Sequence, residues 1–475
     1  MISIATQASS TTYDRSACRV GMVHLGFGAF HRAHQAWYVD RMMDATGELN
    51  WAIAAVNLRA ADSTSFARSQ GADGRYILKT VAADGACQYR IMRPHLRFAD
   101  WPQTPAKATR LLALKDVQVV TITITESGYH LRGGNELDRA ATPIAAEIEG
   151  RASRTVYAYL RAGLKRRQAA ASGALTIMCC DNLRKNGVLL RHALEQYLNA
   201  CGDSALLDWM QANVSFPSSM VDRITPRPPA DLARSSAKAL GCVVRPAVLA
   251  EEYVQWVVED NFKGAAPPLE SAGVQIVPCV EPFEEAKIRI LNGGHTALAY
   301  LGALAGHATF DQAMQNPELL AHFRRFQLAE VIPALGGGFP FSLTEYAQTV
   351  EQRFANPHIG DAIERICMDG VNKMRIFMLP TVVGTLHRGA QPVAAYRSIA
   401  SWVHFARAVL GGHMAMDYVD PDFQPLAGLF APGQEHKLAT ATALWGSVPA
   451  QYPSFIQGLV TAVTAFVFPN KNVLT

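Results

Sequence analysis

The chain has 475 residues, of which 49% are hydrophobic and 18% charged, a balance typical of a globular protein and not of a disordered one. It is too long for one compact core, so two domains are expected. The formal net charge of +4 at pH 7 is small for this length, which argues against a nucleic-acid partner. The longest apolar run, near residues 455–468, is too short for a membrane span and predicts a buried helix.

The eight cysteines are scattered at irregular spacing, and the adjacent pair Cys179 and Cys180 is too close in sequence to bridge readily. We therefore expect reduced thiols and a cytoplasmic enzyme. Neither an H-E-x-x-H motif nor a Cys/His pattern with zinc spacing occurs, so we expect chemistry without a metal.

A buried parallel strand is predicted over residues 19–25, followed by the glycine pair Gly26-Phe-Gly28 and a helix to about residue 43. A strand, a G-x-G turn and a helix together are typical of dinucleotide binding, because the glycines let the backbone approach a pyrophosphate at the helix N-terminus. His31 stands where the usual motif has its third glycine. The predicted cofactor residues here are Gly26, Gly28, Phe30, His31 and Arg32, while His34 either joins them or packs.

The next strand is predicted over residues 51–56, and the loop after it reads the cofactor ribose in such folds. Asn57 and Asp62 are the candidates for holding the 2′-hydroxyl of NAD. Arg59 equally suits the 2′-phosphate of NADP, so NAD is preferred and NADP stays open.

Further along, the pattern predicts a hairpin over 76–90, strands over 117–125 and 174–179, and helices over 145–165 and up to residue 198. The two strands end in polar residues, Glu126 and the pair Asp181-Asn182. Ligands bind at the carboxyl ends of parallel strands, so Glu126 is predicted on a proton path and Asn182 at the reacting oxygen. The alternatives are a surface carboxylate and a helix cap.

Asp222 and Arg223 lie in a proline-rich stretch that predicts a preorganised polar element or a structural ion pair. A last strand is predicted over 274–277, and the prolines around it mark a domain boundary. We expect a dinucleotide-binding domain over residues 1–280 and a mostly helical substrate and catalytic domain over 281–475. The predicted fold class is α/β, with an extended Rossmann domain followed by this helical domain.

The stretch from Lys287 through Asn292 to His295 is the predicted centre of catalysis. On an α-helix, Asn292 lies roughly 140° and His295 roughly 80° around the axis from Lys287, so the three share one side. A lysine that takes a hydroxyl proton, an amide that stabilises the oxyanion and a histidine that holds a neighbouring hydroxyl suit metal-free alcohol oxidation by hydride transfer. The alternative is a helix with a snorkelling lysine and a packed histidine.

Five motifs occur in one order: Gly26-Phe-Gly-Ala-Phe-His-Arg-Ala-His-Gln35, Thr123-Ile-Thr-Glu-Ser-Gly-Tyr129, Cys180-Asp-Asn-Leu183 with Asn186-Gly187, Asp222-Arg-Ile-Thr-Pro226, and Lys287-x4-Asn292-x2-His295. Together they resemble the mannitol dehydrogenase family of polyol-specific long-chain dehydrogenases, most of all its D-arabinitol dehydrogenases.

The resemblance implies an enzyme that binds NAD or NADP without a metal, is a monomer, and has its site between the two domains. It implies that Lys287 is the base, Asn182 and Asn292 stabilise the oxyanion, and His295 and Asp222 hold substrate. Glu126 would gate the proton path, and Arg365 and Lys373 would be further substrate contacts.

The implied substrate is a small polyol or ketose, with D-arabinitol or D-mannitol as the expected alcohols. Two alternatives remain open: a fructuronate or tagaturonate reductase, in which Arg365 or Lys373 would hold a carboxylate, and an epimerase that retains its NAD.

Overall fold

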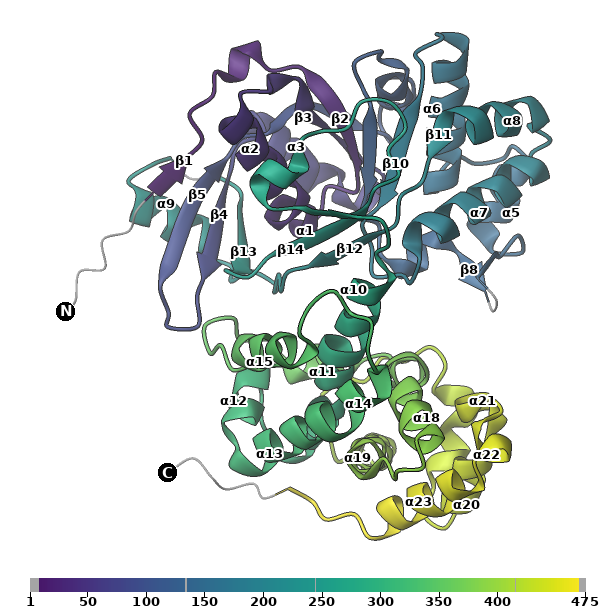
Figure 1. The fold of residues 1–475 in the computed structure, drawn as a ribbon. Helices are drawn as coiled ribbons and strands as arrows, with labels where there is room; N and C mark the ends of the chain where they lie inside the picture. The colour runs from purple at the N-terminus through teal and green to yellow at the C-terminus, as the bar shows by residue number, and fades with distance from the viewer. Residues whose placement is uncertain (1–7, 133–134, 244, 415, 470–475) are drawn as a thin grey trace. The chain divides into compact units, whose positions relative to one another are not determined.

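The computed structural model describes residues 8–132, 135–243, 245–414 and 416–469. The chain divides into two compact units, residues 1–281 and 282–475. Figure 1 shows strands and helices mixed in the first unit and helices in the second, coloured green to yellow.

Unit 1 is built on a parallel sheet of six strands in the order β11-β10-β7-β2-β3-β6. The strands are β2 (Val20–Leu25), β3 (Ala52–Asn57), β6 (His95–Asp100), β7 (Val119–Ile122), β10 (Leu175–Cys179) and β11 (Val214–Ser215). Every residue of β2, β3, β7 and β10 is buried. That is why these strands are mostly apolar in the sequence, since helices or a second sheet cover both faces.

One face of this sheet packs against apolar side chains of α4, α6, α7 and α8, and the other against α2 and a small three-stranded sheet. The helices of unit 1 are α1 (Ala29–Ala33), α2 (Gln35–Thr46), α3 (Ser63–Gly71), α4 (Pro105–Arg110), α5 (Thr142–Ile148), α6 (Val156–Ala169), α7 (Asn186–Ala200), α8 (Ser204–Asn213) and α9 (Leu232–Leu240). The order of strands is that of a Rossmann domain, which confirms the predicted fold class.

Three smaller sheets complete unit 1, in the orders β1-β5-β4-β13, β12-β14-β15 and β8-β9. Their strands are β1 (Ala8–Ser10), β4 (Tyr76–Val81), β5 (Cys87–Met92), β8 (Leu131–Arg132), β9 (Glu136–Leu137), β12 (Ser219–Asp222), β13 (Ala247–Glu251), β14 (Gln255–Glu259) and β15 (Gln275–Val277). Strands β4 and β5 are antiparallel, which confirms the predicted hairpin.

Two predicted helices of unit 1 are wrong in extent. The helix after the glycine pair is interrupted at His34, whose backbone (φ −116°, ψ −88°) is not helical, so α1 and α2 are separate. The helix predicted over 145–165 is two helices, because the buried Glu147 carboxylate accepts hydrogen bonds from the backbone N–H of Arg154 and Thr155 and closes the intervening loop.

Unit 2 consists of helices around α11 (Gly293–Leu304) and α19 (Val393–Leu410), which contact each other in the core. The others are α10 (Glu281–Ala286), α12 (Phe310–Gln315), α13 (Pro317–Arg325), α14 (Ile332–Leu335), α15 (Leu343–Phe354), α16 (Ile363–Cys367), α17 (Gly370–Lys373), α18 (Leu379–His387), α20 (Glu435–Thr440), α21 (Thr442–Trp445), α22 (Val448–Gln451) and α23 (Pro453–Thr464). The apolar run near 455–468 forms only part of a buried helix, because Val467 and Phe468 lie beyond α23 and are exposed. No helix in the described ranges meets the length and apolarity that a membrane crossing requires.

Three segments of unit 2 are π-helical rather than α-helical: Lys287–Asn292, Phe326–Val331 and Met374–Met378. The first of them contacts the other two. π-Helical turns are rare and often mark functional sites, and here one of them contains the predicted catalytic lysine.

Candidate active site

The glycine pair lies at the carboxyl end of β2 and has two different structural roles. Gly26 has φ +93°, and a Cβ there would lie 1.9 Å from the Thr123 carbonyl oxygen, so only glycine fits. Gly28 is exposed, and a Cβ built on it would meet no heavy atom within 4 Å. The first glycine therefore allows close packing of β2 against the loop after β7, and the second leaves an open cradle.

Three buried histidines lie beneath this loop. His24 and His31 stack with ring centroids 3.3 Å apart, and the Nε2 atoms of His31 and His95 are 2.9 Å apart. His24 Nε2 lies 2.9 Å from the Gly26 carbonyl oxygen, and burial lowers the pKa of His24 to about 3, so the ring is neutral and donates that hydrogen bond. The histidines thus support the loop from below. In this arrangement the His31 side chain has no exposed surface for the predicted contact with a phosphate.

The other polar residues of α1 and α2 differ from each other. Arg32 lies over the rings of Phe27 and Tyr76, at 5.3 and 5.9 Å, and its Nε donates to the Gly28 carbonyl oxygen at 3.3 Å. The contact with Gly28 puts this cation beside the cradle, and burial lowers its pKa. His34 is buried and bonded to the Gln255 carbonyl oxygen, so it packs rather than facing the cradle. The half-buried Phe30 stacks on His34.

The loop after β3 has a fixed inner residue and an exposed outer pair. Asn57, 4% exposed, donates to the Arg59 carbonyl oxygen at 2.8 Å and to Asp100 Oδ1 at 2.9 Å. Its side chain therefore holds the loop in shape. Arg59 and Asp62, the candidates for reading the ribose, form an exposed ion pair with Nε and Oδ2 3.4 Å apart. Such a surface pair is worth little, so either side chain remains available to a ligand.

The loop after β7 is held by the carboxylate of Asp181, a role that the sequence did not indicate for this member of the Asp181-Asn182 pair. Asp181 Oδ2 accepts hydrogen bonds from Ile124 N (2.9 Å) and Tyr129 Oη (2.7 Å), and Oδ1 accepts one from Thr125 N (3.1 Å). Thr125 has φ +72°, a strained conformation for a β-branched residue. Glu126 follows directly and is exposed, at the start of a short 3-10 helix. Asp181 thus fixes the segment that carries Glu126.

Burial raises the pKa of Asp181 to about 6, although its hydrogen bonds favour the charged form. Neither Asp181 nor Asn182 caps α7, contrary to the predicted alternative, because α7 begins after Lys185 without a side-chain cap. Asn186 instead donates to the carbonyl oxygens of Asp181 and Ser219. Asn182 itself is exposed, next to Asp181.

The end of β12 carries Asp222, which is 4% exposed. Its neighbour Arg223 donates to the carbonyl oxygens of Ala33 and Glu251, so this guanidinium is a structural brace between loop segments. In unit 1, then, the adjacent parallel strands β10, β7, β2 and β3 have their carboxyl ends on the same side of the sheet. The residues at or just after these ends are Asn182, Glu126, the glycine pair and Asn57.

The π-helical segment changes the predicted geometry of the catalytic stretch. The expectation of roughly 140° between Lys287 and Asn292 assumed an α-helix and is wrong. With about one residue more per turn, a π-helix advances about 80° per residue, so residues five apart lie only about 40° around the axis from each other. Lys287, 7% exposed, and Asn292 therefore share one narrow face. His295 follows in the first turn of α11.

A buried amide supports this segment from a neighbouring π-helical turn. Gln327, 1% exposed, donates from Nε2 to the Ile290 carbonyl oxygen at 2.7 Å. Gly294 makes room for it, since a Cβ on Gly294 would lie 2.6 Å from that nitrogen. Neither the π-helix nor Gln327 was found from the sequence, although the Gly293-Gly294 pair in a helix was a possible signal of close approach.

His295 is held between aromatic rings and faces a carboxylate. It stacks on Phe354 with centroids 3.9 Å apart and meets the edge of Phe310. Burial, with smaller contributions from Arg365, Lys373 and Arg353, lowers the pKa of His295 well below its usual value, so the ring is neutral. Its Nε2 lies 4.0 Å from Asp361 Oδ2, and Asp361 also binds Arg365. The predicted substrate contacts His295 and Arg365 thus both lie near Asp361, a residue that the sequence did not reveal.

Lys373, the other predicted contact, donates to the Ile366 carbonyl oxygen at 2.5 Å, and burial lowers its pKa. Unit 2 therefore presents an amine, an amide, a neutral imidazole and a guanidinium, a set that donates to and accepts from hydroxyl groups.

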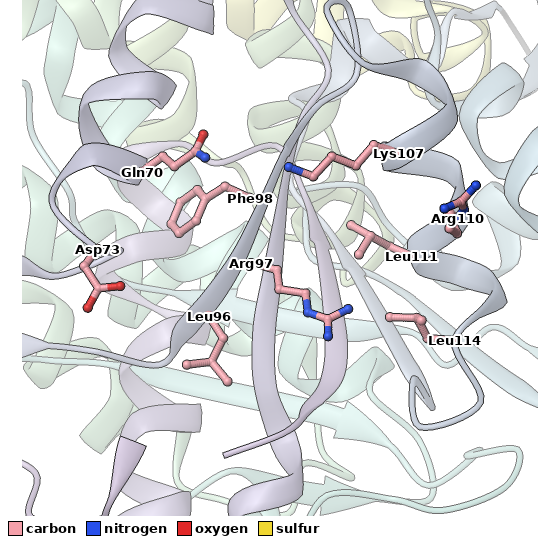
Figure 2. Close-up of a pocket in the computed structure, with 9 residues that line it drawn as sticks. All are labelled: Gln70, Asp73, Leu96, Arg97, Phe98, Lys107, Arg110, Leu111 and Leu114. Atoms are coloured by element: carbon pink, nitrogen blue, oxygen red, sulfur yellow. The ribbon is translucent and has the colours of Figure 1, made fainter. Parts of the chain in front are cut away.

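A cavity of about 460 Å³ lies elsewhere, beside the edge strand β6 of unit 1 (Figure 2). Arg97, Lys107 and Arg110 surround it, with leucine side chains and Phe98 in its wall. It contains none of the predicted site residues, so it is not the candidate active site.

A parallel doubly wound sheet with a G-x-G loop after its central strand places the chain in the class of Rossmann-type dehydrogenases. Two family models match it, the mannitol dehydrogenase Rossmann domain over residues 20–271 and the mannitol dehydrogenase C-terminal domain over residues 279–466. The chain belongs to the mannitol dehydrogenase family and is an oxidoreductase, which confirms the resemblance seen in the five motifs.

Similar proteins agree over nearly the full length. D-arabinitol 4-dehydrogenase of Ralstonia nicotianae is 36% identical over 449 residues, 94% of this chain and 95% of that protein. Mannitol 2-dehydrogenase of Pyrenophora tritici-repentis is 32% identical, over 97% of this chain and 82% of that protein. The structure of Pseudomonas fluorescens mannitol 2-dehydrogenase, a ternary complex with NAD and D-mannitol, matches with a TM-score of 0.85 and 31% identity, over 96% of this chain and 94% of that one.

Proposed function

We propose that this protein oxidises a secondary alcohol of a neutral sugar alcohol, D-arabinitol or D-mannitol, by reversible hydride transfer to NAD, with Lys287 as the general base. The observation that carries the proposal is the π-helical segment, which puts a buried lysine and an amide on one face. The similarity to D-arabinitol 4-dehydrogenase and to the complex of mannitol 2-dehydrogenase with NAD and D-mannitol supports the substrate class and the cofactor.

The residues of unit 1 fit a dinucleotide. Gly28 offers the open cradle that a pyrophosphate needs, and Arg32 lies beside it on aromatic rings. Asn57 shapes the ribose loop, and Asp62 is proposed to hold the 2′-hydroxyl, with Arg59 as the route to NADP. When bound, NAD supplies the acceptor for the hydride that leaves the carbinol carbon.

In the proposed reaction, neutral Lys287 accepts the proton of the substrate hydroxyl while the carbon–hydrogen bond breaks and a ketone forms. Asn182 and Asn292 donate hydrogen bonds to the alkoxide oxygen as its charge develops. A donor of this kind is worth about 3–4 kcal/mol of transition-state stabilisation. In the reverse direction Lys287 returns the proton to the ketose oxygen.

The remaining residues are assigned to proton release and substrate binding. Glu126, exposed on the loop that Asp181 fixes, is proposed to relay the proton from Lys287 to solvent. His295 is neutral and therefore able to accept from one substrate hydroxyl and to donate to another. Asp222, Arg365 and Lys373 are proposed to hold the other hydroxyl groups.

We also propose that residues 1–280 bind the cofactor and residues 281–475 supply the base and the substrate contacts, and that the enzyme is a cytoplasmic monomer. Eight cysteines, all of them free thiols, support a reducing compartment.

The test is NAD reduction at mildly alkaline pH by the purified protein, with D-arabinitol, D-mannitol and D-sorbitol in parallel and NADP in a second series. Absorbance of the reduced cofactor and the ketose product are both followed. Reduction with one polyol is expected. Product without reduced cofactor would indicate an epimerase, and NADH oxidation with fructuronate or tagaturonate alone would replace the proposal with a hexuronate reductase.

A further inference from the structure

The carboxylate of Asp361 lies close to two of the predicted substrate contacts of unit 2. The residue is 6% exposed and lies two positions before α16. Its carbonyl oxygen accepts a hydrogen bond from Phe310 N at 2.9 Å, and the next residue, Ala362, forms an isolated bridge with Thr309. The backbone at Asp361 and directly after it is therefore anchored, which restricts the side chain.

Two predicted substrate residues lie close to this carboxylate. Arg365 donates to Asp361 Oδ1 from Nε (2.9 Å) and Nη2 (2.5 Å), and to Oδ2 from Nη2 (2.6 Å). His295 Nε2 faces Oδ2 from 4.0 Å. The Arg365 side chain is 60% exposed whereas that of Asp361 is 7% exposed, so the pair presents its guanidinium outward over a buried negative charge.

We propose that Asp361 is a specificity-determining residue that makes this site select neutral polyols over sugar acids, by balancing the charge of Arg365 and occupying one edge of its guanidinium. The inference rests on the proposed function, because it takes Arg365 and His295 as substrate contacts. It adds to that function the residue that discriminates against sugar acids, which the catalytic set alone does not define.

The physical reason is the difference between binding a hydroxyl and binding a carboxylate. A free arginine binds a carboxylate through two parallel hydrogen bonds from one edge. In this structure the Nε–Nη2 edge of Arg365 is already used by Asp361. A second carboxylate at the remaining edge would lie near a buried negative charge that solvent screens poorly. A hydroxyl needs only one donor and no net charge, so the Nη1 group still serves it.

Lys373 does not make up for the positive charge of Arg365 that Asp361 balances. Its Nζ donates to the Ile366 carbonyl oxygen, so one of its donors is already used and fewer are open to an anion than in a free lysine. The contacts of both predicted cations therefore favour a neutral substrate.

The experiment compares oxidation of D-mannitol and of D-mannonate, which differ by a carboxylate at one end, by the full-length wild-type protein and by Asp361→Asn. The asparagine keeps the shape and removes the charge. The expected wild-type ratio of kcat/KM for mannonate over mannitol is far below 1. In Asp361→Asn this ratio is expected to rise at least tenfold, through a lower KM for mannonate. The double variant Asp361→Asn/Arg365→Gln is expected to lose that gain, since the released guanidinium produces it.

Asp422→Asn is the matched control, because Asp422 also pairs with an arginine of unit 2, Arg375, at 3.0 Å but outside this cluster. Its ratio is expected to equal that of wild type. If Asp361→Asn does not fold, Arg365→Gln serves instead. It exposes the Asp361 charge, so the ratio should fall at least threefold.

An unchanged ratio in folded Asp361→Asn, with polyol oxidation intact, would overturn the role of Asp361 and leave the proposed function standing. A wild type that oxidises mannonate but no polyol would overturn the proposed function itself.

Discussion

Replacing Asp181 with asparagine tests whether one half-buried carboxylate holds the loop that carries Glu126. Asp181 accepts three hydrogen bonds, from Ile124 N, Thr125 N and Tyr129 Oη. An asparagine in the same place turns one acceptor oxygen into a donor, so at least one bond is lost. A hydrogen bond to a charged group contributes about 1.5–3 kcal/mol. Release of the strained Thr125 is then expected to displace Glu126 and to lower turnover about tenfold, a barrier increase of about 1.4 kcal/mol.

The pKa of Asp181 also determines how the stability difference between wild type and this variant depends on pH. The pKa of Asp181 is about 6 in the folded protein, against 3.8 for the free side chain. The folded state therefore binds the proton more tightly than the unfolded state, and this stabilising contribution is complete below pH 3.8 and lost as the pH rises through 6. Wild type gains about 1.4 kcal/mol from this group between pH 7 and pH 5, whereas Asp181→Asn has no such group.

The measurement is urea denaturation of both proteins at pH 7 and pH 5, with turnover followed alongside. The difference in unfolding free energy, wild type minus variant, is expected to rise by about 1.4 kcal/mol at the lower pH. Asp84→Asn, in the exposed turn between β4 and β5, is the control and should follow wild type at both pH values. A constant difference between wild type and Asp181→Asn would refute the reasoning, because it would mean that this carboxylate does not bind its proton more tightly on folding.

Four further variants test other parts of the site. Lys287→Ala should bind NAD with wild-type affinity in a fluorescence titration, but its turnover should fall by orders of magnitude. Normal turnover would exclude Lys287 as the base. Gly28→Ala should keep the wild-type melting temperature, because its methyl group meets no atom, and should lower the affinity for NAD at least tenfold. Gly26→Ala should lose stability as well. An NAD affinity of Gly28→Ala equal to that of wild type would remove the cradle from the cofactor site. Gln327→Met should lower the unfolding free energy by about 1 kcal/mol, since the Ile290 carbonyl loses its donor. It should also lower turnover more than tenfold. A loss of stability without a loss of turnover would mean that Gln327 has only a structural role.

The sequence alone determined the elements whose residues need only their neighbours along the chain. Nearly continuous apolar runs marked β2, β3 and β10, because a strand buried on both faces is apolar at most of its positions. The glycine pair after β2 could also be identified from the sequence, because the φ of +93° at Gly26 is a local property that excludes other residues. The five motifs, read together, also identified the family.

Tertiary structure decided what depends on residues far apart in the chain. His31 follows the glycine pair and was expected at the phosphate, but its partner His95 comes from another strand and buries it. Lys287 and Asn292 lie closer around the axis than an α-helix allows, because Gln327, 37 residues beyond Ile290, supports a π-helical turn. Asp181 and Asp361 act through loops and helices that contact them only in the folded chain. No local pattern encodes such partners, since the energy of a buried hydrogen bond depends on what folding brings to it.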